Sequence, residues 1–133
     1  MTRAIYLSVE QLWRLAHAVR PVEDAFGGQT AYLVGSVLRR PDWRDVDVRI
    51  ILPDRDFECL FVPAPPETLT DQFRMLIQTA VSGMLRDATG LPVDFQVQRM
   101  TDANGLYPDG ERNACSKARP YVGPDFIPQW QRT

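Results

Sequence analysis

The chain has 133 residues, a length that suits one domain and leaves little room for two. Hydrophobic residues make up 44% of it and charged residues 24%, which excludes wholesale disorder and fibrous repeats. The formal net charge of −2 argues against a strongly basic nucleic-acid-binding module, although a local basic patch stays open.

The sequence carries no signal for a zinc knuckle, a thiol redox pair or a membrane span. Cys59 and Cys115 lie far apart and form no C-x-x-C pair. No stretch approaches the ~20 apolar residues of a membrane span, and the amino-terminal residues form no apolar signal segment. We therefore expect a cytoplasmic protein with two reduced thiols and no membrane contact.

The first predicted element is a helix that begins after Ser8, whose hydroxyl can cap it while Gln11 completes a capping box. Pro21 is expected to end this helix, and the glycines at 27–28 predict a turn. The run 30–34 (TAYLV) then favours a short strand. The buried face of the helix is expected to consist of Leu12, Leu15, Ala16 and Val19.

The middle of the chain is predicted to alternate between short elements and breaks. Residues 37–44 favour a short helical turn or loop, and residues 45–52 (DVDVRIIL) alternate as a half-buried strand does. A short helix is expected around residues 57–61, followed by a proline-rich linker over 63–66. On the strand, one face is expected to carry Val46, Val48, Ile50 and Leu52, and the other Asp45, Asp47 and Arg49.

The second half predicts one long helix and one more strand. The helix is expected to begin at a cap on Thr68 or Thr70, to run to residue 87 or 88, and to end at Gly90. Residues 91–100 alternate again, and after residue 101 the periodicity disappears. We therefore expect a domain over 1–100 and an irregular arm over 101–133 that packs on the domain or on a partner. The helix carries a wide apolar stripe of Phe73, Leu76, Ile77, Ala80, Val81, Met84 and Leu85. The last strand is expected to place Val93, Phe95 and Val97 on one face, and Asp94, Gln96 and Gln98 on the other.

The acidic residues on the two predicted strands are the best candidates for chemistry. Asp45 and Asp47 project to the same face about 6.5–7 Å apart, where two carboxylates repel each other and a divalent cation relieves the repulsion. If the strands are neighbours, Asp94 converges on this pair. Gly35 permits a close backbone approach, and the Ser36 hydroxyl can bond phosphate oxygens. The alternative is that these acids are simply solvated.

The order of these motifs resembles that of the DNA polymerase β-like nucleotidyltransferases. It reads Leu33-Val34-Gly35-Ser36, then Asp45-Val46-Asp47-Val48, then Val93-Asp94-Phe95, so the resemblance covers roughly residues 30–98. The compact members, called minimal nucleotidyltransferases, are similar in size. The resemblance implies an α+β (α/β) fold, with a small mixed β-sheet backed by helices.

The resemblance also implies an activity and a role for each motif. Gly35 and Ser36 would bind the β- and γ-phosphates of an NTP. Asp45 and Asp47 would ligate Mg²⁺ or Mn²⁺, and Asp94 would act as a further ligand or as the general base. An NMP would pass from the NTP to a hydroxyl of a small molecule, a protein or a tRNA end, with release of pyrophosphate.

Other functions stay open at this level. The segment after residue 98 is too short and irregular for the second domain that many family members carry. This departure favours a catalytically silent domain that acts through a homodimer, a protein partner or a toxin–antitoxin-type complex. A nuclease-like carboxylate site is a third hypothesis.

Several basic and aromatic residues have two explanations each. Three arginines between the motifs are either solubilising or contact triphosphate or a nucleic-acid backbone. Arg49 pairs with Asp47 or reaches a phosphate, and Trp43 either packs or stacks on a base. Trp13 is expected to pack and His17 to lie at the surface. The three arginines are Arg39, Arg40 and Arg44.

Overall fold

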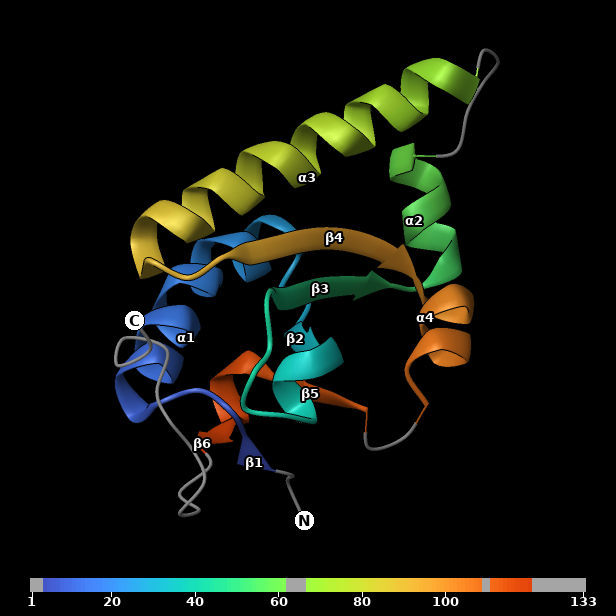
Figure 1. The fold of residues 1–133 in the computed structure, drawn as a ribbon. Coiled ribbons are helices and arrows are strands. Elements are labelled where there is room, and N and C mark those ends of the chain that lie inside the picture. Colours follow the sequence, from blue (N-terminus) through green and yellow to red (C-terminus); the bar gives the residue numbers. More distant parts are fainter. Residues whose placement is uncertain (1–3, 62–66, 109–110, 121–133) are drawn as a thin grey trace.

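The computed structural model describes residues 4–61, 67–108 and 111–120, and it has an α+β fold (Figure 1). A four-stranded mixed sheet has the order β4-β3-β2-β5, in which β3 and β4 are parallel and the other pairs are antiparallel. A separate pair of short strands, β1 and β6, is parallel. The helices are α1 (Val9–Ala25), α2 (Asp54–Phe61), α3 (Glu67–Thr89) and α4 (Met100–Leu106), with 3-10 turns η1 (Gly35–Leu38) and η2 (Cys115–Lys117). The strands are β1 (Ala4–Ile5), β2 (Ala31–Val34), β3 (Val46–Leu52), β4 (Val93–Arg99), β5 (Arg112–Ala114) and β6 (Arg119–Pro120).

The start of α1 agrees with its prediction and its end does not. The Ser8 hydroxyl accepts a hydrogen bond from the Gln11 backbone N–H, and the Gln11 side chain accepts one from the Ser8 N–H, so the capping box is confirmed. Pro21 does not end the helix, which continues to Ala25. A proline costs one hydrogen bond inside a helix, and here its ring is exposed while the neighbouring Val22 packs into the core.

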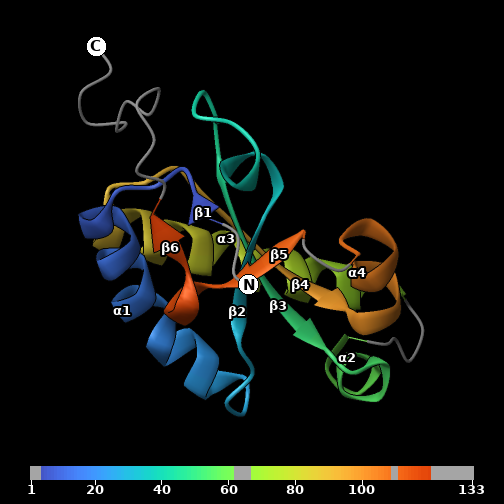
Figure 2. The ribbon, with the colours of Figure 1, turned by 90° about the horizontal axis from the view of Figure 1, so that it is seen from below.

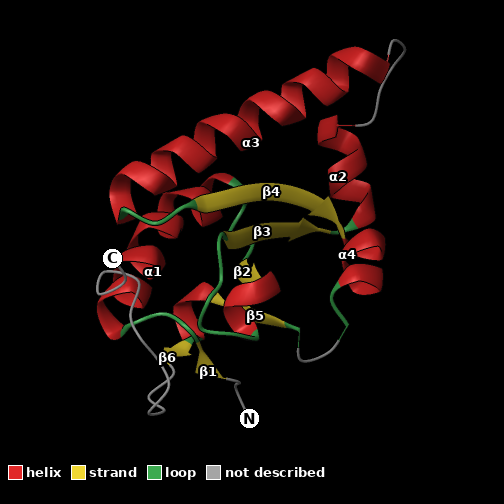
Figure 3. Ribbon diagram, in the orientation of Figure 1, coloured by secondary structure: helices red, strands yellow, loops and turns green. Residues whose placement is uncertain are grey.

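The apolar faces of β3 and β4 form the centre of the core, as their alternation predicts. Every apolar residue assigned to those faces is buried, and α1 and α3 contribute Leu15 and Leu85 to the same cluster. Figure 3 shows the helices grouped around the strands. Burial of this apolar surface is the main force that holds the helices to the sheet.

The long helix α3 differs from its prediction at its start and in its stripe. It begins at Glu67, so Thr68 and Thr70 lie inside it and do not cap it. Gly90 does end it, with φ of +72° and an N–H that donates to the Arg86 carbonyl at 2.8 Å. Only part of the predicted stripe packs on the core, namely Ile77, Val81 and Leu85. The rest faces solvent, with exposed fractions of 49% for Phe73, 65% for Leu76 and 44% for Met84.

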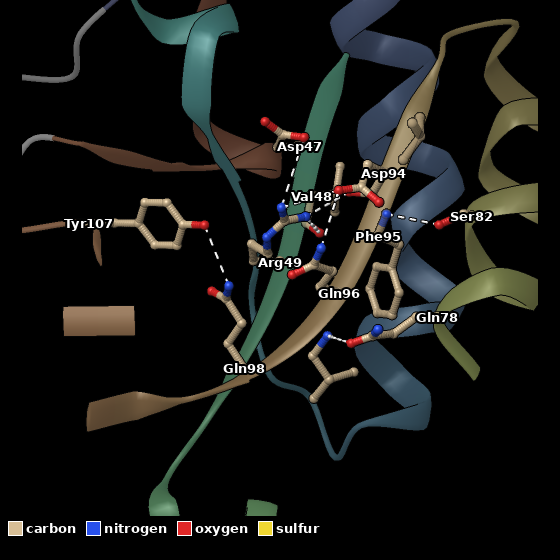
Figure 4. A network of polar contacts seen from close by, with 12 residues as sticks. Asp47, Val48, Arg49, Gln78, Ser82, Asp94, Phe95, Gln96, Gln98 and Tyr107 are labelled. Atoms are coloured by element: carbon tan, nitrogen blue, oxygen red, sulfur yellow. Dashed lines mark hydrogen bonds and ion pairs between the residues drawn. The ribbon is translucent and has the colours of Figure 1, made fainter. Parts of the chain in front are cut away.

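Side chains of α3 seal the free edge of β4. The Ser82 Oγ accepts a hydrogen bond from the Phe95 N–H at 2.9 Å, and the Gln78 Oε1 accepts one from the Val97 N–H at 3.0 Å (Figure 4). At the start of the strand, Arg86 Nε donates to the Val93 carbonyl at 2.8 Å. The helix therefore replaces a fifth strand as the hydrogen-bonding partner of the sheet edge.

The described part of the expected carboxyl-terminal arm is not irregular. It contains α4, and β5 pairs with β2 to complete the sheet, with Leu33 opposite Asn113. These elements are too short for hydrophobic periodicity to reveal them in the sequence. The predicted linker at 63–66 and the last part of the arm, 121–133, lie outside the described residues.

Two smaller expectations concern thiols and membranes. Both cysteines are free; Cys59 is exposed, and burial raises the pKa of the Cys115 thiol. Within the described ranges, no helix is both long enough and apolar enough to cross a membrane.

Candidate functional site

Two of the three predicted carboxylates meet on the polar face of the sheet. Asp47 and Asp94 are direct register partners on the parallel strands β3 and β4. Residues paired in this way point to the same face, so both side chains lie on the side opposite the apolar core (Figure 4). The neighbouring strands that the prediction required are therefore present.

Gly35 lies directly against Asp47. Val34 is the register partner of Asp47, so the chain turns into η1 beside the carboxylate. Gly35 has a φ of +81°, and a Cβ atom built there would fall 2.3 Å from the Asp47 Oδ2. Glycine suits this position, because L residues are strained at this φ and a Cβ atom would push the Asp47 carboxylate aside.

A buried arginine holds the two carboxylates together. The Arg49 guanidinium donates to the Asp94 Oδ2 at 3.3 Å and lies 3.9 Å from the Asp47 Oδ1. It also donates to the backbone carbonyls of Asp94 at 2.7 Å and Val48 at 3.0 Å. Its side chain is only 6% exposed. Of the two roles predicted for Arg49, the structure shows the pairing with Asp47. The same guanidinium also pairs with Asp94 and supplies positive charge to both acids.

The electrostatics of Asp47 reflect this crowding. Burial raises the pKa of Asp47, Arg49 lowers it, and the charges of Asp94 and Asp45 raise it further; the net shift is upward. Asp45 lies in an exposed position just before β3. It is thus close enough to influence Asp47 electrostatically without joining the carboxylate pair.

The donor chemistry of the pair fits a divalent cation in part. Carboxylate oxygens are the hard ligands that Mg²⁺ and Mn²⁺ take. Among the residues that the structure describes, however, no cluster of three or more acidic, histidine or cysteine side chains is arranged to hold a metal. The predicted convergence of three carboxylates is therefore met by two, Asp47 and Asp94.

The predicted phosphate-binding residues lie in η1 and the loop after it. Ser36 is half-buried, and its carbonyl accepts hydrogen bonds from the N–H groups of Arg39 and Arg40. The side chains of both arginines are exposed and lie near acids, Arg39 at 4.0 Å from Glu111 and Arg40 at 3.7 Å from Asp42. In this arrangement neither guanidinium forms an ion pair with Asp47 or Asp94. Arg44, the third predicted arginine, is exposed as well.

The aromatic residues separate into packed and exposed ones. Trp43 is buried, and its Nε1 donates to the Tyr6 carbonyl at 2.6 Å, so it packs and is not available to stack on a base. Trp13 was expected to pack, but it is 63% exposed on α1. Its ring lies 4.4 Å from that of His17, which is at the surface as predicted.

Sequence reasoning missed the cavities beside the carboxylate pair. Gln96 and Gln98 continue the row of Asp94 along β4; the Gln96 Nε2 approaches the Asp94 Oδ2 at 3.4 Å, and the Gln98 Nε2 approaches the Tyr107 hydroxyl at 3.4 Å (Figure 4). Cavities of about 330 and 780 Å³ border this row. The alternation of β4 reveals the polar row, but the walls come from α2, α3 and α4 and need the folded chain.

In comparisons with known proteins, no family model, no curated protein and no solved structure matches the chain.

Proposed function

We propose that this protein is a metal-dependent nucleotidyltransferase of the minimal type, with a nucleotidyltransferase-like fold. The observation that supports it best is the placement of Asp47 on β3 between Gly35, which follows the end of β2, and Asp94 on the adjacent strand β4. Two solvated surface acids would not require a glycine at +81° against one carboxylate and a buried guanidinium beside both. The proposal takes up the resemblance carried by the three motifs.

The carboxylates would bind the metal, and one of them would accept the proton of the attacking hydroxyl. Asp47 and Asp94 would bind Mg²⁺ or Mn²⁺, and Asp45 would add a third carboxylate from its exposed position. The bound cation would neutralise phosphate charge and polarise the reacting phosphoryl group. Asp94, at the outer strand of the pair, would accept the proton of the attacking hydroxyl when a base is needed.

The phosphates would lie on the other side of Asp47. Gly35 and Ser36 close the end of β2 there, and the backbone of the turn can approach the β- and γ-phosphates closely. Arg39, Arg40 and Arg44 are exposed nearby in the chain and would contribute positive charge.

The proposed reaction is a displacement at the α-phosphorus of an NTP. The acceptor oxygen forms a bond to this phosphorus, and the bond from it to the bridging oxygen of the β-phosphate breaks. Pyrophosphate leaves with that electron pair, and the hydroxyl proton passes to Asp94 or to water. The products are a nucleotidylated acceptor and pyrophosphate.

One observation favours a second candidate function. Arg49 already lies beside both Asp47 and Asp94 and offsets one of their two negative charges, so the protein itself compensates part of the charge of the pair. A domain of this kind could be catalytically silent and act through contacts with a second copy or another protein.

Isothermal titration calorimetry distinguishes the two functions. We expect the protein to bind an NTP, tested as ATP, GTP, CTP and UTP, only with Mg²⁺ or Mn²⁺ present. The variant Asp47→Asn/Asp94→Asn should lose the metal-dependent heat, whereas the matched control Asp42→Asn, an exposed loop residue, should keep it. Equal binding by all three proteins, or no binding by the wild type, would contradict the proposed enzyme.

A further inference from the structure

The outer side of α3 carries a row of exposed apolar residues. The exposed fractions are 49% for Phe73, 65% for Leu76 and 44% for Met84, and Ala80 is exposed between the last two. These residues follow one another at spacings of three and four, the period of a helix–helix contact. Figure 1 shows α3 along the outside of the fold, with the sheet on one side of it only. We call these four residues the α3 seam.

Charged residues are scarce around the α3 seam. From residue 72 to residue 85 the only charged residue is Arg74, whose guanidinium is turned toward α2, 5.6 Å from the centroid of the Phe57 ring. Further along, Arg86 donates to a backbone carbonyl of β4, and Asp87 lies beyond the end of the seam. The solvent-facing side of a surface helix normally carries charged residues. The outer side of α3 therefore has the composition of a contact surface.

An apolar cavity opens beside the α3 seam. Its volume is about 570 Å³, and it lies between α3, α2 and the end of α1. Phe73, Ile77 and Val81 line it from α3, and Phe26 and Leu60 line it from the other two helices. Leu60 is itself 50% exposed. The surface thus offers both protruding apolar side chains and a hollow that such side chains can fill, which are the two parts of an interdigitating contact.

The order of residues along the seam fits a second copy of the same helix. Ala80 has Leu76 about one turn before it and Met84 about one turn after it. If two copies of α3 cross antiparallel about a two-fold axis at Ala80, the Leu76 of each copy faces the Met84 of the other. The small Ala80 side chains meet at the axis and let the two helices approach closely. Both copies then use the same surface, as a two-fold interface requires.

The size of this surface predicts a weak dimer. The 23 residues of α3 make it about 34 Å long and, with side chains, about 10–12 Å across. With the adjoining edge of α2, each copy offers on the order of 500 Å², below the roughly 800 Å² that each partner of a standard interface buries. Interfaces below that size are typical of weak, reversible association. Because uncharged residues meet at the axis, no like-charge repulsion opposes the contact there.

We infer that the protein forms a reversible homodimer through the α3 seam, with two copies of α3 crossing antiparallel at Ala80. The expected dissociation constant is about 1–100 μM. The inference is independent of the proposed nucleotidyltransferase activity, because the seam shares no residue with the carboxylate pair of Asp47 and Asp94.

The test places charges at the proposed two-fold axis. In such a dimer residue 80 meets itself, so Ala80→Arg and Ala80→Glu each bring two like charges together. Ala80 is exposed and both new residues are good helix formers, so the fold should stay intact, which circular dichroism checks. The control Leu106→Arg adds the same charge at a 59% exposed apolar residue of α4. Sedimentation equilibrium of the full chain over the micromolar range measures the dissociation constant of each dimer.

We expect the wild type and Leu106→Arg to approach twice the 15.2 kDa mass of the chain as the concentration rises. Each Ala80 variant alone should stay near the monomer mass, with a dissociation constant raised about tenfold or more. An equimolar mixture of Ala80→Arg and Ala80→Glu should dimerise again, because opposite charges then meet at the axis. This recovery also shows that both variants are folded.

Three results would overturn the inference. A wild type that stays monomeric excludes the dimer, and its binding to phosphatidylcholine–phosphatidylglycerol vesicles would then assign the α3 seam to a lipid surface. Unchanged dimerisation of both Ala80 variants would place the interface elsewhere. A mixture of the two variants that stays monomeric would exclude a contact of Ala80 with itself. Metal-dependent NTP binding is measured separately, so the proposed function can fail or stand whichever of these results is obtained.

Discussion

The two ends of the parallel pair β3 and β4 are built from similar polar residues and have opposite character. At the start of the strands, Asp47 is packed against Gly35, and the buried Arg49 pairs with both Asp47 and Asp94 and offsets one of their two negative charges. At the far end, Gln98 and Arg99 border an open cavity of about 780 Å³. The comparison teaches that a polar row becomes an ion-paired centre or the wall of an open cavity according to what surrounds it.

The surroundings differ because different elements flank each end. Near the start, β2 and η1 close over Asp47. At the far end, α2 and α4 lie side by side, as Figure 1 and Figure 2 show. Both Asp54 carboxylate oxygens accept hydrogen bonds from Thr101, one from its backbone N–H and one from its hydroxyl, which joins these two helices. The same contact lowers the pKa of Asp54.

The largest expected effect tests how tightly Gly35 packs against Asp47 at the start of the parallel pair. Gly35→Ala should lower the free energy of unfolding by about 2–4 kcal/mol, because the left-handed backbone is strained and the new Cβ displaces Asp47. Gly28→Ala is the control: its φ is +83° but nothing lies within 4 Å of a Cβ there, so about 1 kcal/mol is expected. Urea denaturation measures both. Equal losses would show that the contact with Asp47 does not matter.

The next test removes the Arg49 guanidinium from the start of the parallel pair. Arg49→Met should lower the free energy of unfolding by about 2–3 kcal/mol, because two adjacent carboxylates lose their shared partner. In an Asp94→Asn background the same substitution should cost clearly less, since only one carboxylate is left. A double-mutant cycle in urea measures the coupling. The same cost in both backgrounds would mean that Arg49 acts through packing and not through charge.

A third test addresses the edge of β4 that α3 seals. Ser82→Ala should cost about 1–3 kcal/mol, because the buried N–H of Phe95 loses its acceptor. Thr79→Ala changes an exposed residue of the same helix and should stay within about 0.5 kcal/mol of the wild type. Hydrogen exchange of the Phe95 amide reports the local effect directly. An unprotected Phe95 amide in the wild type would contradict the sealed edge.

The smallest expected effect concerns how the stability of the protein depends on pH through Asp47, at the start of β3. The folded state raises the pKa of Asp47, so ionising this acid costs stability once the pH exceeds the ordinary value of about 3.9. Asp47→Asn should therefore be more stable than the wild type at pH 7, and the difference should vanish as the pH falls below that value. A stability gap that grows toward acid pH would have the wrong sign for this explanation.

The sequence predicts elements well where their pattern is long and local. The alternation of β4, the Ser8 capping box and the Gly90 helix end all depend on neighbouring residues, and each is present in the structure. The strand β3 is present too, but it is not half-buried as predicted, because Arg49 and Ile51 on its second face are buried as well. Short elements such as α4 and β5 were missed, because too few residues carry a period. Pro21 was expected to end α1, but the helix continues past the hydrogen bond that this proline removes, with Val22 packed in the core.

The candidate site was predictable in its composition and only partly in its geometry. Alternation predicted polar strand faces for Asp47 and Asp94, and their convergence depended on the two strands being neighbours, which the pairing of β3 with β4 shows. Whether Arg49 meets the acids depends on a rotamer, and the buried state of Trp43 depends on its bond to the Tyr6 carbonyl far along the chain. Such contacts between distant segments have no local signature in a single sequence.

The way α3 satisfies β4 has a consequence for assembly. An open strand edge is a template on which another extended chain can add and start an amyloid-like stack. At β4 the N–H groups of Phe95 and Val97 are already engaged, so an incoming strand would first have to peel away the helix. Growth of the four-stranded sheet is thereby directed to its opposite border, β5, whose three residues offer a poor seed for polymerisation.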